Sequence, residues 1–276
     1  MSYEEEKEIA VLSAELKRRI EAVEPSKRKR VLKGVIMAAL GSVPWVGSVL
    51  AAAASYKNEE TQIETDRFQM EWIAEHEQKW KGLARDIVEI VARLDSFGEE
   101  VVERLQSEEY LALVRKAFRV WDAADTDEKR QYVCRLITNA GGTTFRPDDL
   151  IRLFLDWLDR YHEAHFTVIR EIYRHPGVSR YGIWKNIHGQ FPADSSSEAD
   201  LFRLLIGDLS LGRVIRQHRR VDSQGRFRAR KRTRAKSGGL MKSAFDREEP
   251  YELTELGKEF VHYVFQEAVP RIGNGS

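Results

Sequence analysis

The strongest constraint on this chain is a run of 23 residues without a charge, Gly34 to Tyr56, in a protein that is 32% charged. A run of this kind needs a cover, because apolar side chains left in water cost free energy. Pro44 and Gly47 divide it into two short arms, each too short to span a bilayer, which predicts a hairpin rather than a single transmembrane helix. The residues directly before the run are five bases with no acid among them: Lys27, Arg28, Lys29, Arg30 and Lys33.

Three covers are compatible with this pattern: a bundle formed by the chain itself, another subunit, or lipid. A basic flank and an aromatic residue at the turn are typical of segments that meet anionic membranes. In character, though not residue by residue, the segment resembles the hydrophobic hairpins of helical pore-forming toxins and bacterial defence effectors. The residues expected to enter the membrane or an oligomer interface are Val35, Ile36, Leu40, Val43, Trp45, Val46, Val49 and Leu50.

The pattern around the hairpin is helical. Residues 2–24 predict an amphipathic helix that Pro25 stops, Val31 to Val43 can continue as a helix, and residues 48–97 predict one long helix. In the long helix, apolar residues recur at the alternating spacing of a coiled coil or a long bundle helix, interrupted by His76. This helical seam consists of Ile73, Trp80, Leu83, Ile87, Ile90, Leu94 and Phe97.

Further helices complete a first domain at residues 1–160. Leu111 to Trp121 marks one helix, and Asp125 with Glu128 three residues later resembles a capping box that opens the next, which closes at Asn139–Gly142. Pro147 opens an aromatic-rich helical segment that continues to His175 and must be buried on one face. The predicted fold class is therefore mainly α, with an all-helical N-terminal domain.

Residues 161–276 have a different pattern. Helices are expected at 164–174, 179–190 and 197–210, followed by a strand at Val214–Ile215, a basic loop, and a strand at Tyr251–Leu253 that passes into a closing helix. The segment GVSRYGIWKNI, the strand start at Arg213 and the sequence YELTELGKEFVHYV resemble a winged-helix domain over about residues 160–268. In such domains a Leu-Thr-x-x-Gly segment joins the last strand to the final helix, and Leu253, Thr254 and Gly257 match it.

The wing of this domain, residues 213–249, is expected to bind a polyanion. Residues 213–236 contain eleven Lys and Arg and one Asp, a net charge of +10. Because the whole chain has a net charge of +1, the rest of it carries −9. Nucleic acid bound through its backbone, an anionic membrane surface or an acidic protein would each suit these bases, and a solvated loop is the plainer alternative. The predicted contacts are Arg219, Arg220, Arg226, Arg228, Arg230, Lys231, Arg232, Arg234 and Lys236.

The helix expected to precede the wing argues against sequence-specific recognition. Its polar positions include Glu198, Asp200, Arg203 and Asp208, an acidic set without the paired Arg, Asn or Gln side chains that read base edges. The sequence therefore predicts non-specific contact rather than operator binding.

Signals for catalysis are weak. His162 and His165 stand three apart beside Glu163 and Asp159, whereas the zinc-protease motif needs histidines four apart, so structural histidines are the better interpretation. Cys134 lies in an apolar pattern and is expected to be a buried thiol; as the single cysteine it favours a reducing, cytoplasmic setting. We therefore expect no enzymatic activity, no cofactor and no metal site. Residues 1–24 lack the pattern of a secretory signal.

The pattern as a whole favours a non-enzymatic effector or regulator. Such a protein would couple a winged-helix binding or sensing module to a helical domain that oligomerises or inserts its hairpin into a membrane. This arrangement suits bacterial (anti-phage) defence. One alternative is a nucleic-acid-binding regulator that dimerises through the Ile73–Phe97 seam, and another is a protein-binding adaptor. The expected partners are a second copy or another protein, non-specific nucleic acid and an anionic surface, in the cytoplasm or recruited to the inner membrane.

Overall fold

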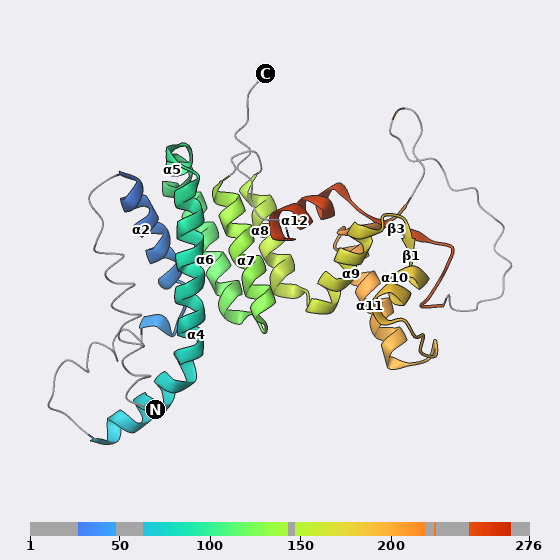
Figure 1. Ribbon diagram of the computed structural model, residues 1–276, viewed down its shortest axis with the longest axis horizontal. Coiled ribbons are helices and arrows are strands. Elements are labelled where there is room, and N and C mark those ends of the chain that lie inside the picture. The colour runs from blue at the N-terminus through green and yellow to red at the C-terminus, as the bar shows by residue number, and fades with distance from the viewer. Residues whose placement is uncertain (1–26, 48–62, 143–146, 219–223, 225–242, 266–276) are drawn as a thin grey trace. The chain divides into compact units, whose positions relative to one another are not determined.

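The computed structural model describes residues 27–47, 63–142, 147–218, 224 and 243–265, with the side chains of residues 63–77 left out (Figure 1). The described chain is mainly helical, as the sequence predicts. It divides into two compact units, which are described separately below. Unit 1 comprises Met1–Arg160 and Tyr263–Ser276, and unit 2 comprises Tyr161–His262. The predicted second domain extended to residue 276, whereas the described residues from Tyr263 onward group with unit 1.

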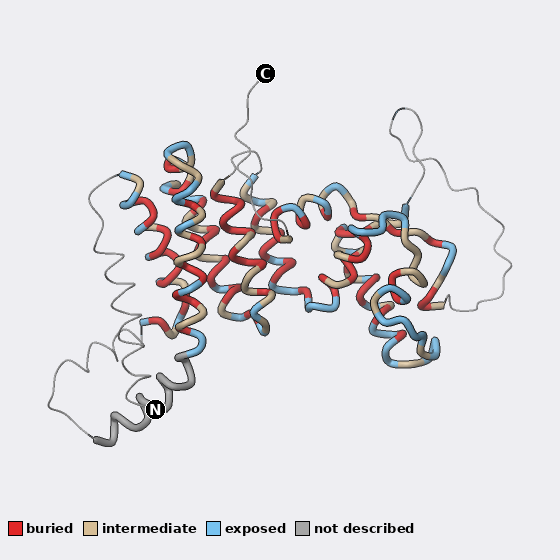
Figure 2. Tube along the Cα trace, in the orientation of Figure 1, coloured by how far each residue is buried: buried red, intermediate tan, exposed pale blue. Residues whose placement is uncertain are grey.

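Unit 1 is built from packed helices. Its elements are α2 (Lys27–Leu40), α4 (Ile63–Ser96), the short 3-10 helix η1 (Glu99–Val101), α5 (Val102–Gln106), α6 (Glu108–Ala123), α7 (Asp127–Gly141) and α8 (Asp148–Arg160). Helix α6 packs against α2, α7 and α8, and α4 packs against α2 and α7. Buried residues recur along the helix faces that meet one another (Figure 2).

Two helix boundaries in unit 1 differ from the prediction. Helix α2 ends at Leu40, and a turn over Gly41–Trp45 follows, so the helix stops before Val43. Helix α7 is capped by Thr126, whose hydroxyl accepts a hydrogen bond from the backbone N–H of Lys129. The predicted cap, Asp125, is wrong by one residue, because a threonine in extended conformation can fill the same role.

The predicted close of helix α7 is confirmed. The helix ends at Gly141, with Gly142 as its C-terminal cap. A Cβ atom on Gly141 would overlap the side chains of Leu94 and Tyr110. Glycine is needed here for close packing, because any side chain would push α4 or α6 away.

Unit 2 combines helices with a small sheet. Its elements are α9 (Glu163–Arg174), β1 (Val178–Ser179), α10 (Arg180–His188), α11 (Ser197–Leu211), β2 (Ile215–Gln217), β3 (Pro250–Leu253) and α12 (Glu255–Phe265), the last turn of which belongs to unit 1. The sheet order is β1-β3-β2 with antiparallel pairing throughout. The aromatic-rich segment is therefore broken between α8 and α9, at the boundary between the units.

The sheet differs from the predicted two-stranded hairpin by one strand. Val178 pairs with Tyr251 and Ser179 with Pro250, which makes β3 the central strand. Ile215 pairs with Leu253 on the other side of β3. A two-residue strand has no periodicity of its own, so its position depends on a partner far along the chain.

The Leu-Thr-x-x-Gly segment ties the sheet to α12. The Thr254 hydroxyl accepts a hydrogen bond from the backbone N–H of Gly257 at 2.9 Å and donates one to the carbonyl of Arg213 at 2.6 Å. A Cβ on Gly257 would overlap the carbonyl oxygen of Val214. Thr254 thus caps α12, and Gly257 lets that helix approach the backbone just before β2.

Candidate polyanion-binding cleft

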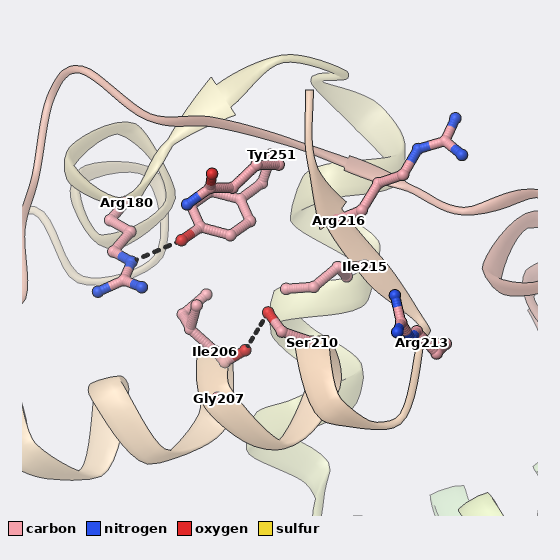
Figure 3. A pocket seen from close by; sticks show the side chains of 9 residues that line it. Arg180, Ile206, Gly207, Ser210, Arg213, Ile215, Arg216 and Tyr251 are labelled. Atoms are coloured by element: carbon pink, nitrogen blue, oxygen red, sulfur yellow. Dashed lines mark hydrogen bonds between the residues drawn. The ribbon is translucent and has the colours of Figure 1, made fainter. Parts of the chain in front are cut away.

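A cleft of about 490 Å³ opens in unit 2 between α11, β2 and the central strand β3 (Figure 3). Ile206 and Ser210 of α11 lie opposite Tyr251 and the first residue of α10, Arg180. The polar residues that line the cleft are Arg180, Ser210, Arg213, Arg216, Gln217 and Tyr251. Three arginines from separate segments therefore line one opening.

Arg180 is held in place by Tyr251. Its Nε donates to the Tyr251 hydroxyl at 3.0 Å, and its guanidinium carbon lies 5.5 Å from the centre of that ring. Tyr251 is itself buried, at 2% exposure, and so forms a fixed support. The two terminal nitrogens of Arg180 have no partner in the described part of the chain. They remain available for an anion, close to the positive end of α10.

Arg213 stands at the opposite end of the cleft, in the short connection from α11 to β2. Its backbone lies in the left-handed region, with φ of 60°, which is uncommon for a residue other than glycine. The side chain is exposed and makes no ion pair with any described residue. An arginine held in this conformation presents a full charge at the rim of the cleft.

Arg216 is partly neutralised. Its Nε donates to Glu252 Oε1 at 2.7 Å, and Nδ1 of His218 lies 2.7 Å from Oε2 of the same carboxylate. Burial alone would raise the pKa of Glu252, but the hydrogen bonds from His218 and Arg216 outweigh it, so that the pKa is lowered. Glu252 is therefore ionised at neutral pH and offsets one positive charge of the cleft, while Arg180 and Arg213 are not offset.

The polar groups of the cleft are mainly charged hydrogen-bond donors. The Ser210 hydroxyl donates to the carbonyl of Ile206 at 2.7 Å, so its proton is engaged within α11. Guanidinium groups without a carboxylate partner bind phosphate or carboxylate oxygens with charge-assisted hydrogen bonds. The cleft is suited to a phosphate group or another anion.

The predicted wing contacts lie outside the described residues. This holds for Arg219, Arg220, Arg226, Arg228, Arg230, Lys231, Arg232, Arg234 and Lys236. The described chain stops on one side at His218, which follows β2 and whose N–H donates to Pro250 of β3 at 2.7 Å. The cleft therefore lies beside the strand that leads directly into the basic segment.

Helix α11 contains the acidic residues noted in the sequence. Glu198 and Asp200 are exposed, and Arg203 pairs with Asp200 at 2.7 Å and with Asp194 at 3.2 Å. Asp208 lies 3.6 Å from Nε2 of His165. The outer face of α11 thus carries negative charge and no unpaired base.

The first arm of the uncharged run is packed inside unit 1. Val35, Ile36, Leu40, Val43 and Val46 are buried, at 2–9% exposure. Residues Val49 and Leu50 lie outside the described part of the chain. In the described ranges, none of the helices has the length and apolar character needed to cross a membrane.

Trp45 is half-buried at the turn of that run. Its Nε1 donates to Oδ1 of Asp122 at 2.7 Å, and its ring meets Trp80 edge to face with centres 6.4 Å apart. A hydrogen bond and an aromatic contact therefore attach the turn to α6 and α4.

The helical seam is also covered by unit 1. Trp80, Leu83, Ile87, Ile90 and Leu94 have exposed fractions of 0–2%. Phe97 is half-buried against Gly142, and the side chains of Ile73 and His76 lie outside the described set. A dimer through the covered part of the seam would require unit 1 to open.

Sequence analysis missed a buried carboxylate beside the seam. Asp86 accepts hydrogen bonds from Nε1 of Trp121 at 2.8 Å, Nε2 of Gln131 at 3.2 Å and Nε of Arg85 at 3.1 Å, with its side chain fully buried. Cys134 is buried next to it, and burial with the nearby carboxylate raises the pKa of its thiol. The sequence contained one sign of this buried carboxylate: an aspartate stands between Leu83 and Ile90 on the apolar face of α4.

The two histidines have structural roles. His165 is buried, stacks on Tyr161 with ring centres 4.9 Å apart, and accepts a hydrogen bond at Nδ1 from the backbone N–H of His162. Burial lowers the pKa of His165, and the nearby Asp208 carboxylate opposes this in part. In the described ranges, three or more His, Cys, Asp or Glu side chains nowhere gather as a metal site.

Searches of family models, of curated proteins and of solved structures returned no match to this chain. Its function is therefore argued from the geometry of the two units.

Proposed function

We propose that unit 2 is a winged-helix module that binds the phosphate backbone of nucleic acid without reading bases, and that the chain acts by binding rather than by catalysis. The order helix, strand, two helices, two strands and helix supports this assignment, as does the central position of β3 between β1 and β2. In this arrangement residues 218–249 form the wing and α11 takes the place of the recognition helix.

The observation that carries the proposal is the pair of unneutralised arginines at the base of the wing. Arg180 and Arg213 line one cleft from different segments, and the chain leaves that cleft through β2 into residues 219–236, which hold nine Lys and Arg and one Asp. A phosphate in the cleft and further phosphates at the bases of residues 219–236 would then be contacted by the same module. Such contacts give affinity and position but no sequence preference.

The outer face of α11 supports backbone binding over base reading. A helix inserted into the major groove has to bring donors to base edges past two rows of phosphates. Glu198 and Asp200 on that face would be repelled by the phosphates, and Arg203 is engaged with two carboxylates. We therefore place the nucleic acid at the cleft and the wing.

Unit 1 serves, in this proposal, as the helical body to which the module is attached. A second candidate function, insertion of the apolar run into an anionic membrane, is favoured by one observation: Lys27, Lys29, Arg30 and Lys33 are exposed on α2. Insertion would require α2 to leave α6 and the Trp45–Asp122 bond to break. Co-sedimentation of the intact protein with liposomes of anionic lipid, compared with neutral lipid, tests it directly; equal recovery with both removes this candidate.

The test of the main proposal is fluorescence anisotropy of the intact protein with a labelled random duplex over a range of salt concentrations. We expect Arg180→Gln and Arg213→Gln each to weaken binding about 3- to 10-fold and to reduce the salt slope by about 1. Changing Arg228, Arg230, Lys231 and Arg232 together to Ala should remove most of the affinity.

The matched control is Arg174→Gln, an exposed arginine of α9 outside the cleft. It should leave affinity and salt slope nearly unchanged. Absence of binding at low salt, or equal losses in Arg174→Gln and the cleft variants, would contradict the proposal. Binding to an acidic protein but not to duplex would favour the adaptor alternative instead.

A further inference from the structure

Helix α11 exposes a row of leucines that nothing in the described chain covers. Leu201, Leu204 and Leu211 are 53%, 56% and 77% exposed, and Gly207 is exposed on the same side. Successive residues three, four and seven apart lie along one side of a helix, so these four positions form one stripe about 15 Å long. The other exposed large apolar residues of the described chain, Met37, Tyr173 and Phe191, lie on other elements.

Two carboxylates stand along this leucine stripe, Asp200 four residues before Leu204 and Asp208 four residues after it. Asp200 is paired with Arg203 at 2.7 Å, and Oδ2 of Asp208 lies 3.6 Å from Nε2 of the buried His165. The stripe therefore offers a partner three exposed leucines, with one carboxylate at its first turn and one between Leu204 and Leu211.

The two ends carry opposite charge. Glu198 lies in the first turn of α11 and is exposed, and hydrogen bonds from the backbone and from Ser196 lower the pKa of its carboxyl. Arg213 follows the last turn and is exposed without an ion pair in the described residues. A surface that is acidic at one end and basic at the other is complementary to a copy of itself turned end to end.

We infer that the leucine stripe is a homodimer interface in which α11 packs antiparallel against α11 of a second copy. A two-fold axis near the middle of the stripe sets Leu201 beside Leu211 of the second copy and Leu204 over the gap left by Gly207, where a Cβ would meet no atom of its own chain. Glu198 then approaches Arg213 of the second copy at both ends. The glycine lets the two helices approach closely, and the opposed helix dipoles attract.

This pairing gives the chain an oligomer interface that does not disturb the buried seam of α4. It also occupies the face of α11 that a base-reading winged helix would need. Gly207 and Arg213 of this interface also line the cleft, whereas Glu198, Leu201, Leu204 and Leu211 lie outside it.

The test is sedimentation velocity of the full chain, treated with nuclease, from about 1 µM to about 100 µM protein. The wild type should convert from monomer to dimer within this range. Leu204→Asp and Gly207→Leu should each weaken the dimer at least about 30-fold, because one buries a charge and the other fills the gap needed for close approach. The matched control is Met37→Asp on α2, an equally exposed apolar residue at 55%, which should dimerise as the wild type does.

A charge exchange tests the orientation. Glu198→Lys and Arg213→Glu should each weaken the dimer several-fold, and the two together should restore it. A wild type that stays monomeric at all concentrations, or Leu204→Asp and Met37→Asp that behave alike, would overturn the interface. A double variant weaker than either single variant would overturn the antiparallel arrangement.

Discussion

Helices α4 and α11 both carry apolar residues at three- and four-residue spacing, yet these residues are buried on α4 and exposed on α11. The seam of α4 is covered by its own unit, with Leu83 and Ile87 at 0% and 2% exposure. On α11, Leu204 and Leu211 remain at 56% and 77% exposure. Periodicity thus shows that a helix face is apolar, but not whether its own chain or a partner will cover it.

The difference follows from how many sides of each helix are apolar. Helix α4 has one apolar face, and α2 and α7 pack against it. Helix α11 carries apolar residues on two sides: Phe202, Leu205, Ile206 and Leu209 fill the core of unit 2, and Leu201, Leu204 and Leu211 remain exposed. A helix with apolar residues on two sides needs a second cover, and a small unit has too few elements to provide it.

The largest expected effect contrasts the two helices directly. Ile87→Asp places a charge among fully buried side chains and should cost about 4–5 kcal/mol or more, enough to unfold unit 1. Leu204→Asp changes an exposed residue, so the stability of the dilute protein should shift by about 0.5 kcal/mol or less. Urea unfolding followed by far-UV circular dichroism measures both. Equal destabilisation by the two variants would show that the stripe of α11 belongs to a core.

The next largest effect concerns Asp86, the buried carboxylate beside the covered seam of α4. Asp86→Ala leaves Nε1 of Trp121 and Nε2 of Gln131 buried without their acceptor, and should destabilise unit 1 by about 3 kcal/mol. Asp159→Ala, at an exposed aspartate of α8, is the control and should have almost no effect. Chemical denaturation of the two variants gives the comparison, and a fully stable Asp86→Ala protein would mean that these donors find other partners.

A smaller effect tests the junction between the sheet and α12. Gly257→Ala forces a Cβ against the carbonyl of Val214 and should destabilise unit 2 by about 2 kcal/mol, because backbone atoms move only at a cost. Gly207→Ala is the same change where a Cβ meets nothing, and it should stabilise α11 by up to about 1 kcal/mol. Thermal unfolding of the dilute proteins should therefore move in opposite directions, and equal shifts would contradict the packing at Gly257.

The smallest expected effect is a pH dependence of unit 2. Burial lowers the pKa of His165 in the folded protein, so the unfolded chain binds the proton more readily. The folded protein therefore has its full stability above about pH 6.5, the pKa of an unperturbed histidine. As the pH drops through that value, the unfolded chain takes up a proton more readily than the folded protein, and the free energy of unfolding falls. Between pH 7.5 and 5.5 the wild type should therefore lose more stability than His165→Gln does.

The control for this effect is His188→Gln, at an exposed histidine of α10, which should retain the dependence of the wild type. Free energies of unfolding from urea titrations at several pH values decide the outcome. If the His165→Gln protein has the same pH dependence as the wild type, His165 is not the group that causes it.

The sequence predicted the features that depend on neighbouring residues. These features are the close of α7 at Gly141–Gly142, the apolar spacing of the seam, and the passage of the last strand into a helix at Leu253–Gly257. Three features could not be predicted because they join distant segments. They are the pairing of Val178 with Tyr251, the hydrogen bond between Trp45 and Asp122 across 77 residues, and the cleft that Arg180 and Arg213 line from opposite ends. No periodicity encodes such contacts.

The contrast between α4 and α11 is tested most directly by thiol labelling with a maleimide reagent. Cys134 is buried and the pKa of its thiol is raised, so the wild type should react only when unfolded. Ile87→Cys should be equally protected. Leu204→Cys should react rapidly in dilute protein and slow down as the concentration rises and α11 pairs with a second copy. Protection of Leu204→Cys at every concentration, or rapid labelling of Ile87→Cys in the folded protein, would contradict the account.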